Sequence, residues 1–169
     1  SGKTTSLRSA LADTVPYYEH SRPFAHVEYP GGVLLGKERG IYSGTDALGM
    51  SVQPLVIEWL QGCPHQVVIG EGDRLGNLKF FGAAEHLGWE LKLIVLHVPT
   101  ELAFQRAAAR ESSFKQSWFN GRISHVDNVM EAYKDKAIII DSCAPQIEVV
   151  AQIVAIPEIQ MLKIAPKLP

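Results

Sequence analysis

The chain has 169 residues, of which 46% are hydrophobic and 20% charged, and its formal net charge at pH 7 is −2. These values predict one globular domain with a substantial core, and they exclude a chain that a strong positive charge drives onto nucleic acid or an anionic membrane. No apolar run approaches the roughly 20 residues that span a bilayer, so no membrane partner is expected. The two cysteines, Cys63 and Cys143, fit no metal-binding spacing, and a reducing, cytoplasmic location is the simplest expectation.

The chain opens with Ser1-Gly2-Lys3-Thr4-Thr5, which matches the second half of the Walker A phosphate-binding motif G-x-x-x-x-G-K-S/T. In that motif, backbone N–H groups at a helix N-terminus cradle phosphates, the lysine reaches the β- and γ-phosphates, and the hydroxyl binds Mg²⁺. The first loop glycine and the strand that precedes the loop are not in the sequence, so we interpret the chain as a fragment cut inside its nucleotide site. The alternative is an ordinary helix start with Thr and Ser in its first turn.

Apolar runs alternate with amphipathic stretches along the chain, which is typical of an α/β fold with a mostly parallel sheet. The expected helices cover residues 4–14, 77–86, 101–110, 123–133 and 145–155, with one more that Asp46 or Ser51 caps and that ends near Gln61. The expected strands cover 24–29, 66–70, 91–98 and 137–140, and 33–36 is either a strand or a turn. Residues 16–23 and 37–43 are expected to be loops. The tail, 157–169, follows a domain that spans 1–156, and 159–165 is a candidate edge strand.

In open α/β sheets, ligands bind beyond the carboxyl ends of the strands. The sequence Glu71-Gly72-Asp73-Arg74 directly follows the expected strand 66–70. Glu71 or Asp73 can supply the carboxylate that holds Mg²⁺, and Arg74 can contact an acceptor or a phosphate. The alternative is a surface turn that contains an Arg–Asp pair.

A second group of cations follows the fourth expected strand. Arg106 and Arg110 are four residues apart and share one helix face, and Lys115 and Arg122 lie in the polar stretch that follows. Cations on a mobile segment can close over phosphates and exclude water, so we expect a lid at about 106–126. The alternative is a solvated helix face.

A third candidate element is the Gly/Thr/Asp-rich segment 43–51. Its backbone N–H groups, with Thr45 and the Asp46 carboxylate, can hold an acceptor, and Arg39 can add a phosphate contact. The alternative is a plain helix N-cap.

Taken in order, these motifs resemble the nucleoside and nucleoside-monophosphate kinase branch of the P-loop proteins. The motifs are Gly2-Lys3-Thr4, the 44–62 segment, Glu71-Gly72-Asp73-Arg74, and Arg106 and Arg110 followed by Arg122. Segments 44–50 and 117–126 are also similar to phage-type P-loop kinases, including those that act on 5-hydroxymethyluracil in DNA. The resemblance implies a three-layer αβα P-loop kinase fold whose first strand is missing from this chain.

The resemblance also implies ATP and Mg²⁺ as cofactors and a nucleoside or nucleotide as acceptor. ATP is then bound by Ser1–Thr5, with Lys3 on the β- and γ-phosphates and Thr4 on Mg²⁺. Asp73 or Glu71 orients the metal or accepts the proton of the acceptor. The negative charge that develops on the transferred group is then expected to be neutralised by three cations, Arg106, Arg110 and Arg122.

We therefore expect an ATP-dependent phosphotransferase that moves the γ-phosphate to a hydroxyl or phosphate of a nucleoside or nucleotide. Three alternatives stay open: a kinase that acts on a modified base in DNA, an NTP-hydrolysing switch or motor module, and a nucleotide-binding scaffold without catalysis. The strand that ends Gly70-Glu71 rather than directly in Asp argues against the switch or motor module. The acceptor and the oligomeric state are left open.

Overall fold

The computed structural model describes residues 2–39, 42–109 and 115–164, with residues 38, 39 and 42 described by their backbone alone. The helices are α1 (Lys3–Leu11), α2 (Val52–Gln61), α3 (Leu78–His86), α4 (Thr100–Ala108), α5 (Gln116–Tyr133), α6 (Gln146–Val154) and α7 (Pro157–Lys163), and the 3-10 turns are η1 (Thr45–Ala47) and η2 (Lys134–Lys136). The strands are β1 (Tyr18–His20), β2 (His26–Tyr29), β3 (Gly32–Leu35), β4 (Lys37–Arg39), β5 (Tyr42–Gly44), β6 (Val68–Gly70), β7 (Leu93–His97) and β8 (Ala137–Asp141). Within the described ranges, none of the helices combines the length and the apolar character needed to cross a bilayer.

The described strands form three separate sheets. One sheet has the order β1-β2-β3-β6, in which β1, β2 and β3 are antiparallel and β3 and β6 are parallel. Strands β7 and β8 form a parallel pair, and β4 and β5 form an antiparallel hairpin. The α/β class is as predicted, but the pairing is mixed, so the expectation of a mostly parallel sheet was wrong for the described strands.

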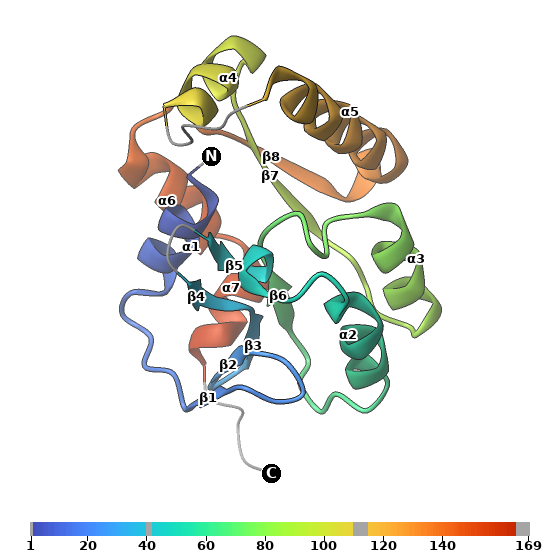
Figure 1. Ribbon diagram of the computed structural model, residues 1–169. Coiled ribbons are helices and arrows are strands. Elements are labelled where there is room, and N and C mark those ends of the chain that lie inside the picture. The colour runs from blue at the N-terminus through green and yellow to red at the C-terminus, as the bar shows by residue number, and fades with distance from the viewer. Residues whose placement is uncertain (1, 40–41, 110–114, 165–169) are drawn as a thin grey trace.

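Helices pack on both sides of the strands (Figure 1). On β3, Leu34 packs toward the apolar cluster of α1, α6 and α7, whereas its neighbours Val33 and Leu35 pack toward the cluster of α2 and α3. This is the alternation of side chains that a strand between two helix layers requires. The strand ends at Leu35 and Gly70 therefore meet along one edge, held between the two layers.

Two segments that were expected to be loops contain short strands. Strand β1 lies in the 16–23 segment, and β4 and β5 lie in and around 37–43. All three residues of β1 are exposed, so no alternation of polar and apolar residues marks this strand in the sequence. Helix α5 begins at Gln116, seven residues before the expected start at 123.

The segment that was expected to form an edge strand, 159–165, is helical over the part that lies in α7. Pro157 stands in the first turn, where its missing N–H costs no hydrogen bond. Ile159 and Leu162 are three residues apart, hence on one helix face, and they are 1% and 0% exposed. Helix α7 therefore contributes to the core that lies under β3.

Candidate functional site

Three separate segments meet at the carboxyl end of β6. The Thr4 hydroxyl in the first turn of α1 donates a hydrogen bond to Glu71 Oε1 at 2.5 Å. Thr4 Oγ1 also lies 2.8 Å from the Ser43 hydroxyl of β5. The corner formed by Thr4, Ser43 and Glu71 thus gathers oxygen ligands from a helix start, a hairpin and a strand end.

Glycine at position 44 permits this close approach. Gly44 has φ +62°, and a Cβ atom placed there would lie 2.2 Å from Glu71 Oε1 and 2.5 Å from the Glu71 carbonyl oxygen. Both the backbone conformation and the available space therefore require a residue without a side chain. The chain can bring Ser43 and Glu71 to the same point because Gly44 stands between the hairpin and η1.

The loop that begins with η1 is tied to the turn that follows β6. The buried Thr45 donates its backbone N–H and its hydroxyl to the Glu71 carbonyl, at 2.8 and 3.0 Å. Asp46 Oδ1 accepts hydrogen bonds from the backbone N–H groups of Asp73 and Arg74, at 2.8 and 3.0 Å. Thr45 thus positions the loop, and the Asp46 carboxylate fixes the 71–74 turn.

Two guanidinium groups lie beside Asp46 and Asp73. Arg74 Nη2 donates to the Asp46 carbonyl at 3.4 Å, and Nη1 contacts the Met50 sulfur. Arg122 on α5 forms an ion pair with Asp73 Oδ2. Burial lowers the pKa of the Arg122 guanidinium and the Asp46 carboxylate opposes that shift, so Arg122 stays a cation at neutral pH.

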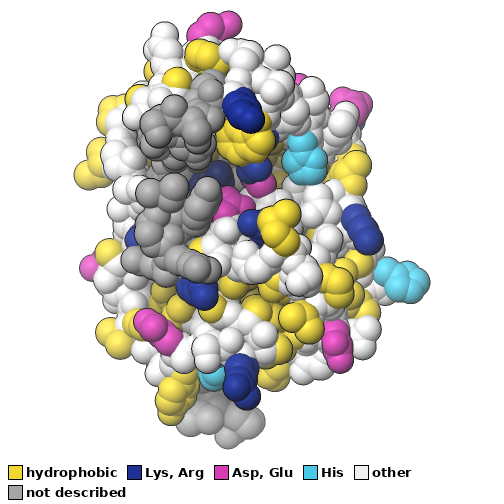
Figure 2. All heavy atoms as spheres, viewed as in Figure 1, with side chains coloured by type: hydrophobic (Ala, Val, Ile, Leu, Met, Phe, Trp, Pro, Cys, Tyr) yellow, Lys and Arg dark blue, Asp and Glu magenta, His cyan; other side chains and the backbone are white. Residues whose placement is uncertain are grey.

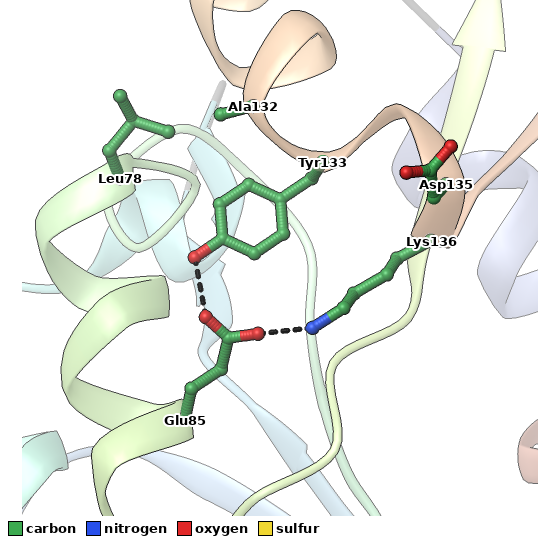
Figure 3. A pocket seen from close by; sticks show the side chains of 6 residues that line it. All are labelled: Leu78, Glu85, Ala132, Tyr133, Asp135 and Lys136. Atoms are coloured by element: carbon green, nitrogen blue, oxygen red, sulfur yellow. Dashed lines mark hydrogen bonds and ion pairs between the residues drawn. The ribbon is translucent and has the colours of Figure 1, made fainter.

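Helix α5 is fixed at two points. Near its middle, the His125 ring nitrogen Nε2 lies 2.8 Å from the Gly76 carbonyl oxygen. At its C-terminal end, Tyr133 donates its hydroxyl proton to Glu85 Oε2 of α3 at 2.8 Å, and the Lys136 ammonium pairs with the other Glu85 oxygen (Figure 3). These contacts border a shallow cavity of about 370 Å³ whose acidic and basic groups pair largely with one another. The contacts of Glu85 with Tyr133 and Lys136 therefore tie the C-terminal end of α5 to α3.

The donor set at the Thr4–Ser43–Glu71 corner suits a hard cation such as Mg²⁺. It consists of two hydroxyls and one carboxylate, all oxygen. Among the described residues, no three His, Cys, Asp or Glu side chains converge on one point. Mg²⁺ is commonly bound through one or two carboxylates and takes its other ligands from phosphates and water, so Thr4 and Glu71 fit it.

The sequence-predicted site residues occupy several different places. Gly2 is the N-cap of α1 and makes no side-chain cap, Lys3 begins the helix, and Thr5 is exposed. Asp73 lies with Arg122, whereas Glu71 lies with Thr4. Arg106 is in the last turn of α4. Ser1, Arg110 and the Arg39 side chain lie outside the described residues.

Sequence reasoning includes Ser43 in the candidate acceptor segment 43–51 but does not predict that it meets Thr4. It fell at the end of an expected loop, and a lone hydroxyl carries no charge that would mark it. The available signal was its position directly before Gly44-Thr45-Asp46, at the entry to the acceptor segment.

Charged side chains also gather on one face of the molecule. Figure 2 shows acidic and basic side chains gathered near the middle of the visible face, with hydrophobic side chains beside them. The chain matches the model of a family described as P-loop Nucleotide Kinase3 over residues 9–151, from within α1 to within α6. No curated protein and no solved structure matches the chain.

Proposed function

Since the chain belongs to the P-loop nucleotide kinase family described as P-loop Nucleotide Kinase3, we propose that it transfers the γ-phosphoryl group of ATP to a hydroxyl or phosphate of a nucleoside or nucleotide. The observation that carries this proposal is the 2.5 Å hydrogen bond between Thr4 and Glu71. A hydroxyl at the start of a helix and a carboxylate at a strand end are the two side chains that hold Mg²⁺ in P-loop phosphoryl transfer.

On the donor side, the N-terminus of α1 is suited to phosphates. Gly2 caps the helix without a side chain, so the first N–H groups are available to an anion. In this proposal Lys3 contacts the β- and γ-phosphates, while Thr4 and Glu71 would hold Mg²⁺. The metal would neutralise charge that develops on the phosphate oxygens.

On the acceptor side, the proposal uses the groups around Asp46. Arg74, whose Nη2 donates to the Asp46 carbonyl, supplies one cation for an anionic acceptor group. Arg122 supplies a second cation, oriented by Asp73. If the acceptor is a hydroxyl, its oxygen forms the new bond to phosphorus as the bond to the β-phosphate oxygen breaks. Asp73 takes the hydroxyl proton, and ADP leaves.

Arg106 and Arg110 keep their proposed role of adding positive charge near the transferred group. Arg39, on the hairpin, is proposed as a further phosphate contact.

We also propose that one more strand belongs between β6 and the β7–β8 pair. Ile69 of β6 and Ile94 of β7 pack against the same cluster of α1, α6 and α7. Among the described strands, however, β6 pairs with β3 alone and β7 with β8 alone. A strand that entered the phosphate loop just before Gly2 would join the two ladders into one continuous sheet.

The test is transfer of radiolabel from γ-labelled ATP in the presence of Mg²⁺. The acceptors are nucleosides, nucleoside monophosphates and hydroxymethylated DNA. Lys3→Ala removes the proposed phosphate contact, and Lys79→Ala, an exposed lysine on α3, is the matched control for loss of one positive charge.

Label on a nucleoside or monophosphate, lost in Lys3→Ala and kept in Lys79→Ala, is the expected result. Label that appears in DNA alone would show that the acceptor is a base within a polynucleotide and not a small molecule. Phosphate released to water, with no labelled acceptor, would contradict the transferase and favour an NTPase.

A further inference from the structure

One face of α5 follows the turn after β6. His125 contacts the Gly76 carbonyl, and Arg122, three residues earlier, pairs with Asp73. Trp118, four residues before Arg122, lies on the same helix face, and the Arg122 guanidinium carbon is 4.9 Å from the centre of its ring. Trp118 therefore lies on the same face of α5 as Arg122, which is one of the residues proposed to bind the acceptor substrate.

The order of these contacts indicates where Trp118 lies. Following α5 toward its N-terminus, the contacts move from Gly76 to Asp73, that is, back along the turn toward Glu71. One further helical turn advances about 5.4 Å in the same direction. The indole therefore lies one helical turn from Arg122, toward the N-terminus of α5, against the guanidinium that pairs with Asp73.

Trp118 is not needed to attach α5 to the core. Its neighbour Phe119 is buried and packs edge-on against Phe104 of α4, with ring centres 5.4 Å apart. Trp118, by contrast, is 49% exposed. A single exposed apolar side chain is common, but this one already has a cation, Arg122, against its ring.

A second exposed apolar side chain stands beside the other guanidinium. Met50, on the loop between η1 and α2, is 82% exposed, and its sulfur contacts Arg74. Arg74 donates to the Asp46 carbonyl, and Arg122 pairs with Asp73, whose backbone N–H donates to the Asp46 carboxylate. Trp118 and Met50 thus flank the same set of charges from two different elements.

We infer that Trp118 is the residue on which the aromatic base of the acceptor stacks, with Met50 on the loop side of the entrance. The acceptor is then a compound that carries a nucleobase, and its sugar or phosphate reaches the cations beside Asp46 and Asp73. Stacking on an aromatic ring tolerates every base, because every base has a π-face. This inference rests on the proposed function for the identity of the reaction and goes beyond it for the recognition of the acceptor.

The first test measures binding without catalysis. Intrinsic tryptophan fluorescence is recorded for the protein and for Trp118→Phe while each of the four deoxynucleoside monophosphates, or 2-deoxyribose 5-phosphate, is added without ATP. We expect at least one monophosphate to change the emission, the change to be absent in Trp118→Phe, and the base-free sugar phosphate to have no effect. Trp59 and Trp89 remain in both proteins as an internal reference.

The second test measures affinity. Trp118→Ala should raise the Kd for the bound monophosphate about 5- to 150-fold, as expected for the loss of one base–aromatic stack. Trp118→Phe should stay within about threefold, because it keeps a ring. Ile147→Ala, at a side chain on α6 that is 79% exposed, is the matched control and should leave the Kd unchanged. The Kd for ATP should not change in any of these variants.

The outcomes separate this inference from the proposed function. If radiolabel reaches an acceptor whose KM is the same in Trp118→Ala, the inference is overturned while the transferase stands. If no monophosphate alters Trp118 emission at millimolar concentration, or if ATP alone does so, the assignment to the acceptor is wrong. If monophosphates quench Trp118 but no label is transferred to any acceptor, the base site stands and the transferase fails.

Discussion

His26 is a buried histidine within a cluster of titratable and aromatic side chains. It stacks on His20 with ring centres 4.6 Å apart, lies 5.4 Å from the Trp59 ring, and its Nδ1–H donates to the Phe24 carbonyl at 2.9 Å. Burial lowers its pKa, with the nearby His20 and His65 acting in the same direction and Glu28 and the bond to Phe24 against it. The neutral ring is therefore the form that the fold favours.

This environment predicts a loss of stability in acid. In the unfolded chain a histidine has a pKa of about 6.5, and in the folded protein the pKa of His26 is lower. The contribution of neutral His26 to the free energy of unfolding is therefore fully present above pH about 6.5. It is lost as the pH falls from there toward the pKa of His26 in the folded protein, by up to about 1.4 kcal/mol per pH unit. Urea unfolding between pH 7.5 and 5 measures this slope.

His26→Asn is the matched variant, because its amide nitrogen can still donate to the Phe24 carbonyl but does not titrate. Its unfolding free energy should depend less on pH than that of the wild type over the same range. Parallel curves for the two proteins would mean that other groups control the acid response.

At the residue scale, the sequence predicted those site residues whose type and position carry a chemical signal. Thr4 follows Gly-Lys, and Glu71 directly follows an apolar run, so the sequence predicts a phosphate site for both, and the structure brings the two side chains together. The pairing of Glu71 with Thr4 and of Asp73 with Arg122 could not be predicted. The pairing depends on the direction in which each carboxylate points from the 71–74 turn. Gly44 and Asp46, which contact this turn from another part of the chain, fix that direction.

At the scale of elements, the junction between β5 and η1 controls the site. Gly44→Ala would force a side chain into the left-handed region and onto the Glu71 carboxylate. We expect a loss of about 2–4 kcal/mol in the free energy of unfolding, from backbone strain and overpacking together. Urea unfolding measures this loss, and titration with MgATP should show weaker binding.

Gly49→Ala, in the same segment, is the matched control, because a Cβ there meets nothing within 4 Å. It should remain within about 0.5 kcal/mol of the wild type. Equal effects of the two substitutions would show that the approach of Gly44 to Glu71 does not hold the site together.

Helix α7 offers a second test at this scale. Leu162 is fully buried, so Leu162→Ala should destabilise the protein by about 2–5 kcal/mol. Met161→Ala, at a neighbouring side chain that is 38% exposed, should cost much less. If thermal unfolding shifted equally in both variants, α7 would behave as a tail and not as part of the core.

The elements that the sequence missed share a physical cause. Residues 159–165 contain apolar side chains at spacings that suit either a strand or a helix, and burial of Ile159 and Leu162 on one face decided for the helix. Strand β1 and the two strands of the β4–β5 hairpin are each only three residues long, and every residue of β1 is exposed, so no alternation of apolar and polar residues long enough to predict a strand is present.

At the scale of the whole molecule, the alternation of apolar runs and amphipathic stretches was sufficient to predict the α/β class. The division into separate ladders was not predicted, because pairing depends on which strands lie side by side and not on the character of each strand. The β7–β8 pair shows the consequence: residues Leu93–Leu96 are apolar but only partly buried. Parallel strands are normally covered on both faces and paired within a sheet.

An added strand should therefore stabilise the molecule. A version of the chain that carries an apolar strand of about five residues, joined to Gly2 by a completed phosphate loop, is expected to unfold at a higher urea concentration, by more than about 3 kcal/mol in free energy. A Gly/Ser extension of equal length is the control. Equal midpoints for the two extensions would contradict a strand position between β6 and β7.

The central claim is that Thr4 and Glu71 act together at a phosphoryl-transfer centre. The most direct measurement is the rate of label transfer from γ-labelled ATP to the acceptor for the wild type, Thr4→Val, Glu71→Gln and the double variant. We predict that each single variant loses at least about tenfold, and that the double variant is little slower than the worse single one, because groups that act as a unit are not additive. Transfer that is unchanged in both single variants, or losses that multiply in the double variant, would contradict the account.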